Sequence, residues 1–151
     1  MNFEKTSAIA EIVSSIAILI TLVYLAIQTN QNTGAINSAS HQQLLNSDLE
    51  LLREMRDAPD ISQTMRSSDP SLEERRRLSS YLTSFLRVRE YAYFQYRDGR
   101  MDEDTWNSYA LVVKSLSRSD IAREIFENSL SGDSYSADFV EAMRGYIHEN
   151  D

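Results

Sequence analysis

The chain contains no cysteine among its 151 residues, and it has only four glycines and two prolines. Without a thiol, the protein forms no disulfide, has no cysteine nucleophile and offers no sulfur ligand to zinc or an iron–sulfur cluster. Because residues that break regular structure are so few, long helices are favoured over an all-β fold. The length suits one ordinary domain, or a small domain with an anchor.

Basic residues are also scarce relative to acids. Fifteen Lys and Arg face 23 Asp and Glu, which gives a formal net charge of −8. Proteins that bind nucleic acid need a basic face to replace the counterions of the phosphates. The composition therefore predicts no nucleic-acid partner.

Motifs that carry chemistry are missing as well. The two histidines, His41 and His148, are far apart and have no metal-ligand spacing. The acids at 102–104 lack the spaced oxygens of a calcium loop, and helix capping explains them better. There is no Gly-rich phosphate loop, serine elbow or di-iron ExxH pair. We expect no catalytic, cofactor or metal site, and a protein that is not an enzyme.

One long apolar run is present. Residues 7–27 contain a single side chain that is charged at neutral pH, Glu11. As a helix they would extend about 31 Å, close to the ~30 Å of a hydrocarbon core. The run lacks the positive start and small-residue cleavage site of a signal peptide. No other segment is apolar enough to cover it as a buried soluble helix. We predict a membrane anchor in residues 1–33, with the span at about 7–27.

One side of the predicted span is made of small and polar residues. They are Ala10, Glu11, Ser14, Ala17 and Thr21. Small residues let helix backbones approach closely in lipid, and hydroxyls or carboxylates can bond across the contact. This face is a candidate for packing against another transmembrane helix. Glu11 has a second interpretation, in which its carboxylate reaches the headgroups beside the positive end of the helix dipole.

Beyond the span, apolar residues recur at helical spacing. The period continues past Gly34 toward Asp57, so the anchor either continues as a long helix or restarts after a kink. Local signals predict a short turn around Ile61–Met65, an N-cap at Asp69 with Pro70 following, a stop at Asp98-Gly99, a cap at Asp102, and starts at Ser119 or Asp120 and at Ser136. The predicted fold is all-α: an N-terminal transmembrane helix continuing into, or followed by, a small antiparallel helical bundle in residues 34–151.

A group of tyrosines and a run of arginines are candidates for a partner surface. Tyr91, Tyr93 and Tyr96 lie close together in one predicted helix, where they either belong to the core, form a protein–protein surface or line a small-molecule pocket. Arg75 and Arg76 belong to a run of three arginines. That run is either a solvated face paired locally with Glu73 and Glu74, or a contact with anionic lipid or an acidic partner.

Residues 3–40 and 85–147 together resemble an uncharacterised group of short bacterial single-span membrane proteins. In that group an apolar span is followed by LAxQIRQNT and a helix, and here the span continues as LAIQTNQNT. The C-terminal half, with YFQYRDGRMDEDTW and SADFVEAMRGYI, is similar to a Tyr/Phe-rich helix that ends at Gly before a Trp-bearing helix. The resemblance implies a membrane anchor and a helical domain, and it implies no activity or cofactor.

The side of the membrane that holds the C-terminal domain has conflicting indications. Lys5 precedes the span and no base follows it before Leu52, so a count of positive charges favours a cytoplasmic N-terminus. The related group usually has bases just after the span, which implies a cytoplasmic C-terminal domain, whereas this chain has Thr29 and Gly34 there. We follow the resemblance and expect the C-terminal domain in the cytoplasm.

These observations predict a single-pass protein of the bacterial inner membrane with a helical interaction domain. Its expected role is that of a scaffold or accessory subunit of a membrane complex. Its expected partners are membrane lipid and other membrane subunits or a second copy of itself. The alternative is a membrane-anchored sensor of a small ligand or lipid that uses the tyrosine-rich helix.

Overall fold

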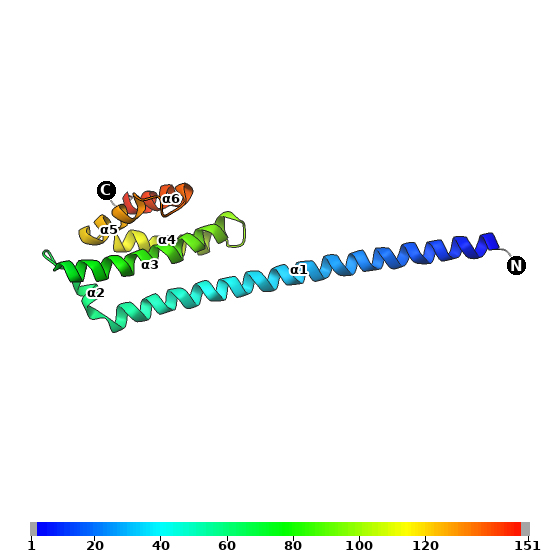
Figure 1. Ribbon diagram of the computed structural model, residues 1–151, viewed down its shortest axis with the longest axis horizontal. Coiled ribbons are helices and arrows are strands. Elements are labelled where there is room, and N and C mark those ends of the chain that lie inside the picture. Colours follow the sequence, from blue (N-terminus) through cyan, green and yellow to red (C-terminus); the bar gives the residue numbers. More distant parts are fainter. Residues whose placement is uncertain (1–2, 149–151) are drawn as a thin grey trace. The chain divides into compact units, whose positions relative to one another are not determined.

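The computed structural model describes residues 3–148, and every regular element within that range is a helix (Figure 1). The helices are α1 (Phe3–Asp57), α2 (Pro59–Thr64), α3 (Leu72–Arg97), α4 (Glu103–Leu116), α5 (Asp120–Leu130) and α6 (Ala137–His148). The predicted all-α class is confirmed. The chain divides into two compact units, Met1–His41 and Gln42–Asp151, and α1 contributes to both.

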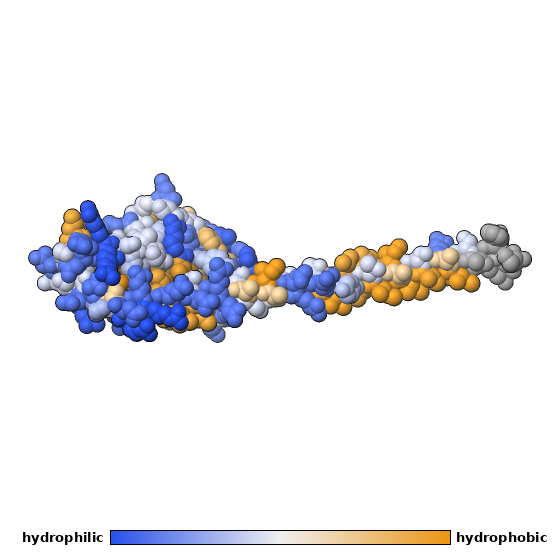
Figure 2. Space-filling model, turned by 60° about the horizontal axis from the view of Figure 1, so that its bottom comes forward, coloured by the Kyte–Doolittle hydropathy of each residue, from blue (hydrophilic) through white to orange (hydrophobic). Residues whose placement is uncertain are grey.

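The N-terminal unit consists of the first part of α1. This helix is unbroken at Gly34, so of the two expected forms the continuous helix is the one observed. Residues 34–41, which the sequence assigns to the bundle domain, group with the N-terminal unit. Figure 2 shows orange, apolar surface along this part of α1. The side chain of Lys5, used in the charge count, lies outside the described side chains.

Proline ends α1 where the sequence predicts it. The backbone of Ala58 is not helical, with φ −118° and ψ 77°, because a residue before proline is disfavoured in the α region. Pro59 then occupies the first turn of α2, where its missing N–H costs no hydrogen bond.

The predicted start of α3 is wrong by two residues. The N-cap is Ser71, and Asp69 and Pro70 precede the helix. Ser71 Oγ accepts a bond from the Glu74 N–H at 3.3 Å, and Glu74 Oε2 accepts one from the Ser71 N–H at 2.8 Å. This reciprocal capping box satisfies two backbone donors, whereas the residue three positions after Asp69 is Leu72, which offers no acceptor.

The turn between α3 and α4 is built as predicted. Gly99 adopts φ +71°, a left-handed conformation that glycine tolerates without strain. The Gly99 N–H bonds the Tyr96 carbonyl at 2.9 Å and the Arg100 N–H bonds the Gln95 carbonyl at 2.8 Å, which is a Schellman ending. Asp102 Oδ1 then accepts the Thr105 N–H at 2.8 Å and caps α4.

The starts of α5 and α6 also agree with the sequence. Ser119 precedes α5, but its hydroxyl donates to the Met65 carbonyl at 2.6 Å instead of capping its own helix. That bond fixes the start of α5 to the segment after α2. The Ser136 carbonyl accepts the first bond of α6, from the Val140 N–H at 3.0 Å.

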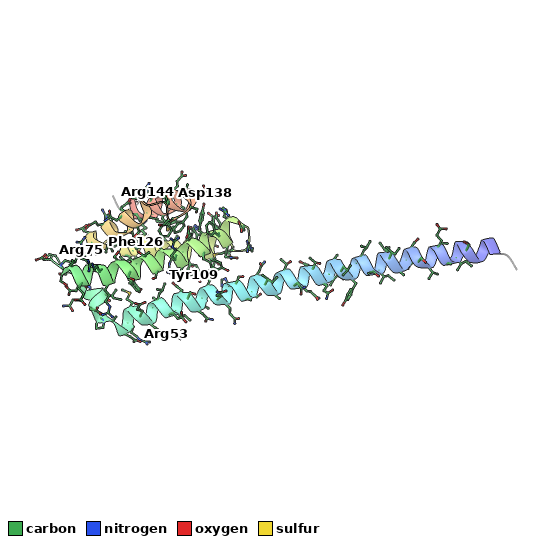
Figure 3. All side chains as sticks on the ribbon, in the orientation of Figure 1. Arg53, Arg75, Tyr109, Phe126, Asp138 and Arg144 are labelled. Atoms are coloured by element: carbon green, nitrogen blue, oxygen red, sulfur yellow. The ribbon has the colours of Figure 1, made fainter. Side chains whose placement is uncertain are left out.

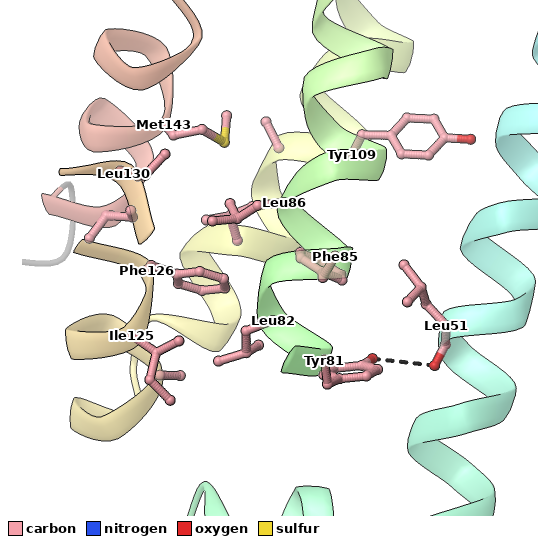
Figure 4. Close-up of a cluster of buried hydrophobic side chains, with 14 of the residues drawn as sticks. Leu51, Tyr81, Leu82, Phe85, Leu86, Tyr109, Ile125, Phe126, Leu130 and Met143 are labelled. Atoms are coloured by element: carbon pink, nitrogen blue, oxygen red, sulfur yellow. Dashed lines mark hydrogen bonds between the residues drawn. The ribbon is translucent and has the colours of Figure 1, made fainter. Parts of the chain in front are cut away.

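Helix α3 organises the core of the second unit. It packs against α2, α4 and α5, and α6 packs on α4 and α5. Figure 4 shows Leu82, Leu86 and Phe126 meeting between α3 and α5. The C-terminal part of α1 adds Leu44 and Leu51, which are buried against this core.

Candidate membrane segment and interaction surfaces

The N-terminal part of α1 presents large apolar side chains around most of its circumference, apart from the face of small and polar residues. Every side chain from Ile9 to Ile27 is exposed. The consecutive residues Ile18, Leu19 and Ile20 are 62%, 62% and 63% exposed, and they point in directions about 100° apart. A helix that exposes apolar side chains in so many directions needs apolar surroundings. Within the described residues, α1 is the one helix long and apolar enough to cross a membrane.

All five residues of the predicted packing face lie on the surface of α1. The Thr21 hydroxyl donates to the Ala17 carbonyl at 2.9 Å, within its own helix. Thr21 therefore offers a neighbouring helix its small size and its methyl group, and its donor is already used. Ala10, Ser14 and Ala17 offer small size in the same way, so close backbone approach is the property that these residues share. Contact with another helix remains a prediction.

The tyrosine-rich stretch of α3 is divided between two faces. Tyr93 meets Trp106 edge-on, with ring centroids 5.4 Å apart, and Tyr96 stacks on the same ring at 6.0 Å. Phe139 of α6 lies 5.8 Å from Tyr93. Tyr91 is 38% exposed and lies apart from this aromatic cluster. The structure thus brings Tyr93 and Tyr96 together and leaves Tyr91 on the surface.

The aromatic cluster joins three helices. Trp106 of α4 is 4% exposed and also contacts Tyr146 of α6 edge-on at 6.3 Å. The Tyr146 hydroxyl donates to Asn107 Oδ1 at 2.8 Å, which satisfies the polar end of a partly buried ring. For Tyr93 and Tyr96 this packing is the core interpretation considered above.

A groove lies beside Tyr91, between α3 and the C-terminal part of α1. Its volume is about 390 Å³, and it is lined by Gln43, Leu44, Ser47, Arg87, Val88 and Tyr91. The Arg87 guanidinium already bonds Glu90 at 2.7 Å and the Ser134 carbonyl at 2.8 Å. The cation in the groove is therefore engaged by the protein itself, and neither Tyr93 nor Tyr96 lines this space.

The arginine run of α3 is paired with acids from other helices. Arg75 Nη2 lies 2.7 Å from Glu124 of α5, and Arg77 Nη1 lies 2.8 Å from Asp60 of α2. Figure 3 labels Arg75 at one end of α3. These two arginines pair with acids of other helices instead of Glu73 and Glu74. Arg75 is one and two positions from those glutamates, which therefore do not face it. Arg77 is at facing distance from both along the helix, and its ion pair is nevertheless with Asp60. Arg76 is exposed.

A buried charge pair joins α3 to the C-terminal part of α1. The Arg89 side chain is 1% exposed, and its Nη1 lies 2.5 Å from Asp48 Oδ1. The guanidinium also lies 3.5 Å above the ring of Phe85. Burial lowers the pKa of Arg89 from its ordinary value, and the Asp48 carboxylate opposes that shift. Nearby, the Tyr81 hydroxyl donates to the Leu51 carbonyl at 3.3 Å.

Sequence reasoning missed this pair. The signal for it is a charge in the middle of an apolar stripe. Asp48 falls between Leu44 and Leu51 at spacings of four and three, so it points the same way as those buried leucines. Arg89 continues the buried series of Phe85 on α3 in the same manner.

The remaining ionisable residues form no ligand set. His148 Nε2 lies 3.0 Å from Glu127, and His41 is exposed. In the part of the chain that the structure describes, no three His, Asp or Glu side chains gather as a metal site would require.

No protein-family model, curated protein or solved structure matches this chain. Within the described residues, the chain has one helix long and apolar enough to cross a membrane and a helical bundle with its own core.

Proposed function

We propose that the protein is a single-pass protein of the bacterial inner membrane and that its bundle is a binding module, a scaffold or accessory subunit of a membrane complex. One observation carries the proposal: the complete exposure of the apolar side chains between Ile9 and Ile27. Nothing in the described chain covers them, and lipid is the environment that suits a helix with apolar side chains around most of its circumference.

The energetics of insertion support this assignment. Eleven Ile, Leu and Val side chains are exposed in the stretch. On an insertion scale each favours the membrane by about 0.3–0.6 kcal/mol at the helix centre. Glu11 opposes insertion, but it lies near the N-terminal end of the stretch, where its carboxylate reaches the headgroups. The Ser15 and Thr21 hydroxyls bond carbonyls of their own helix, which lowers the cost of placing them in lipid.

The binding role is assigned to exposed side chains of α3. Tyr91 is an exposed aromatic residue, and Arg76 is an exposed arginine. Tyr and Arg are enriched at protein–protein interfaces because they combine a large contact area with directed hydrogen bonds. We place the bundle in the cytoplasm, because the bases that usually follow the span in the resembling group imply that side for its C-terminal domain.

Membrane association is tested by alkaline carbonate extraction of bacterial membranes that contain the full chain. We expect the protein to stay in the pellet, and release into the supernatant would overturn the proposal. A reporter that is active only in the cytoplasm, fused after residue 151, tests the sidedness. An inactive cytoplasmic reporter together with an active periplasmic one would reverse the assigned orientation.

The binding role is tested by purification from native membranes under mild detergent. We expect another chain, or a second copy, to copurify at fixed stoichiometry. The change Tyr91→Ala combined with Arg76→Ala should reduce the recovered partner, whereas Arg118→Ala, at an exposed arginine outside this surface, should not. A monomer with no partner would contradict the binding role, and equal recovery from both variants would contradict this choice of surface.

A further inference from the structure

A polar groove lies between α3 and α5. Its volume is about 370 Å³, which is within the range of pockets that hold small ligands. The residues that line it are Arg75, Arg76, Ser79, Ile125, Asn128 and Ser129. The first three belong to α3 and the last three to α5, and these two helices pack against each other. The groove is therefore built within one compact unit of the chain.

The two walls of the groove are constructed in the same way. Ser79 follows Arg75 by four positions and Arg76 by three, so these side chains share one face of α3. The same spacings recur on the α5 wall, in Ile125, Asn128 and Ser129. Ile125, which Figure 4 labels on α5, is 6% exposed, whereas the other five lining residues are half-buried or exposed. Polar side chains thus surround an apolar base.

The middle arginine of the run on α3 has no acidic partner. Arg75 Nη2 lies 2.7 Å from Glu124 Oε1, and Arg77 Nη1 lies 2.8 Å from Asp60 Oδ2. Among the described residues, no ion pair or side-chain hydrogen bond involves Arg76. The chain has a net charge of −8, and yet none of its described acids pairs with this guanidinium. The five N–H donors of Arg76 are therefore available to a ligand.

The neutral lining residues also have unused hydrogen-bonding capacity. On the same helix, the Ser84 hydroxyl donates to the carbonyl four residues earlier at 3.1 Å, as helical serines often do. The side chains of Ser79 and Asn128 make no hydrogen bond within the part of the chain that the structure describes. The Ser129 hydroxyl lies 3.5 Å from the Thr83 hydroxyl, and either oxygen can be the donor. When Thr83 donates, the Ser129 proton is free to point into the groove.

The charge of the groove favours an anion. No Asp or Glu belongs to its lining. Glu124 takes one donor of Arg75 and thereby holds that guanidinium in place, while the remaining donors of Arg75 stay unused. Arg75, Arg76 and Glu124 together carry one positive charge. An anion in the groove is therefore attracted by charge as well as by hydrogen bonds.

Phosphate is the anionic group that suits this set of donors. A phosphate ester presents three terminal oxygens that are strong acceptors, whereas a carboxylate presents two oxygens. A guanidinium binds a phosphate through two parallel N–H···O bonds. The groove adds hydroxyl and amide donors on the opposite wall, so a tetrahedral group can be bonded from two sides.

We propose that the groove between α3 and α5 binds a phosphate group. Arg76 is its principal charged contact and Arg75 the second, and the hydroxyl and amide groups of the lining complete the hydrogen bonds. A soluble phosphate ester and a lipid headgroup offer the same chemistry to these residues. The site goes beyond the proposed function and does not depend on it, because every lining residue belongs to the bundle.

Binding is tested on the purified full chain in an uncharged detergent, with glycerol 3-phosphate as the probe. The width of the phosphorus NMR line of the probe gives the Kd at constant ionic strength. Arg76→Gln should weaken binding by about tenfold or more, because hydrogen bonds from a charged donor are lost. Arg77→Gln is the matched control, since it removes one positive charge from the next residue, which does not line the groove. Equal weakening by the two variants, or no binding by the unaltered chain, overturns the site.

A second pair of variants tests the hydroxyl donors. Ser79→Ala should weaken binding about threefold, because one neutral hydrogen bond is lost. Ser80→Ala, at the adjacent exposed serine outside the groove, should leave the Kd unchanged. Urea unfolding followed by Trp106 should be the same for all four variants, so that a change in Kd does not report a change in folding. A Ser79→Ala variant that binds as tightly as Ser80→Ala would contradict the placement of the ligand in the groove.

Competition identifies the class of anion. Inorganic phosphate should displace the probe, and acetate should require about ten times the concentration or more, because it has fewer acceptor oxygens. Displacement by acetate and phosphate at the same concentration would overturn the choice of phosphate.

The source of the phosphate group is found with the full chain in lipid nanodiscs of phosphatidylcholine. One set contains added phosphatidic acid, and the other contains oleic acid at equal surface charge. A lower affinity for glycerol 3-phosphate in the first set assigns the groove to a lipid headgroup, because the lipid phosphate then competes. Equal affinity assigns it to a soluble phosphate ester. Since the titration uses the purified chain alone, its failure refutes the phosphate site and leaves the membrane span and the protein partner to their own tests.

Discussion

The N-terminal part of α1 and helix α3 are both long helices rich in apolar residues, yet they treat these residues in opposite ways. In α1, Ile18 and Leu19 are 62% exposed, whereas in α3 Leu82 and Leu86 are 0% exposed. The difference lies in the spacing. Apolar residues are consecutive in α1 and recur every three or four positions in α3. The position of the apolar residues around the helix, and not their number, thus decides whether other helices of the same chain can bury them.

Within α1 the pattern changes without a break in the helix. Past Gln42 the apolar residues become periodic, and Leu44 is 1% exposed against the bundle. The helix therefore passes from a segment with exposed apolar side chains to one buried against the bundle without a break in its backbone hydrogen bonds. The boundary between the units at residue 41 is a change of side-chain pattern inside one continuous element.

The largest expected effect is a loss of stability in the bundle that leaves the proposed membrane segment unaffected. Phe126 is 0% exposed and its ring lies 6.4 Å from Phe85, so Phe126→Ala leaves a cavity that costs about 3–5 kcal/mol. Fluorescence of Trp106, the single tryptophan, follows urea unfolding of the full chain in mild detergent. Membrane retention should not change. The control is Leu111→Ala, at a residue that is 50% exposed, and a loss for Phe126→Ala no larger than for this control would contradict the core assignment.

The substitution Leu19→Arg should have the opposite effect, lowering membrane retention without changing the stability of the bundle. Replacing an apolar residue by arginine near the centre of the proposed span shifts the free energy of insertion by about 3–4 kcal/mol against the membrane. We expect a large increase in the fraction released by alkaline carbonate, while urea unfolding of the bundle, followed by Trp106, stays the same. Leu19→Ile is the matched control. If Leu19→Arg and the control are retained equally, lipid does not surround this position.

The charge pair between α1 and α3 gives the next effect. Arg89→Met leaves the Asp48 carboxylate partly buried without its partner, which should cost the bundle about 3 kcal/mol. The double variant Arg89→Met with Asp48→Leu should recover most of that loss, because both charges are then absent. Urea unfolding of the full chain measures both.

The exposed pair of Arg56 and Asp57 provides the control for the buried one. Arg56→Met changes the same residue type at the surface of α1 and should leave unfolding unchanged. A double variant as unstable as the single one would show that the buried pair acts through packing and not through its charges.

The smallest effect is a dependence on pH. Bonds from the Ser71 hydroxyl and N–H hold the pKa of Glu74 below its ordinary value of 4.5, and bonds from the Thr105 N–H and hydroxyl hold the pKa of Asp102 below 3.8. Groups with a depressed folded-state pKa stabilise the fold above the ordinary pKa, and this stabilisation is lost as pH falls through the folded-state pKa. The urea midpoint of the bundle should therefore fall as pH drops below 4.5.

Substitution identifies the groups responsible for that dependence. Glu74→Gln combined with Asp102→Asn should reduce the fall of the urea midpoint at acid pH, so that the acid limb of a plot of midpoint against pH becomes flatter. Glu73→Gln, in the same turn of α3 and outside the capping box, should leave the limb as it is. An unchanged limb in the double variant would assign the acid sensitivity to other carboxylates.

Local chemistry made most helix ends predictable. Gly99, Asp102 and Ser136 act through residues within five positions, so a single sequence contains the whole signal. The signal at the start of α3 was also local, but the prediction of Asp69 as the N-cap overlooked it. The glutamate three residues after Ser71 identifies Ser71 as the N-cap, because these two residues can form the reciprocal box.

Long-range pairing was not predictable in the same way. Arg89 meets Asp48 across 41 residues of sequence, and Arg75 meets Glu124 across 49. Which of the three tyrosines enters the core depends on where α4 and α6 place Trp106 and Phe139, and spacing within α3 carries no information on that placement. The amphipathic pattern fixes which face of a helix is buried and leaves its partner open.

The pair of Asp48 and Arg89 also sets an order of events during synthesis. A growing chain emerges N-terminal end first, at about 5–20 residues per second. Because Arg89 follows Asp48 by 41 residues, the carboxylate waits about 2–8 s for its partner. During that interval the apolar stretch of α1 is already complete, whereas Leu44 and Leu51 have no core to join. The apolar stretch of α1 is thus complete seconds before the bundle has the residues that close it.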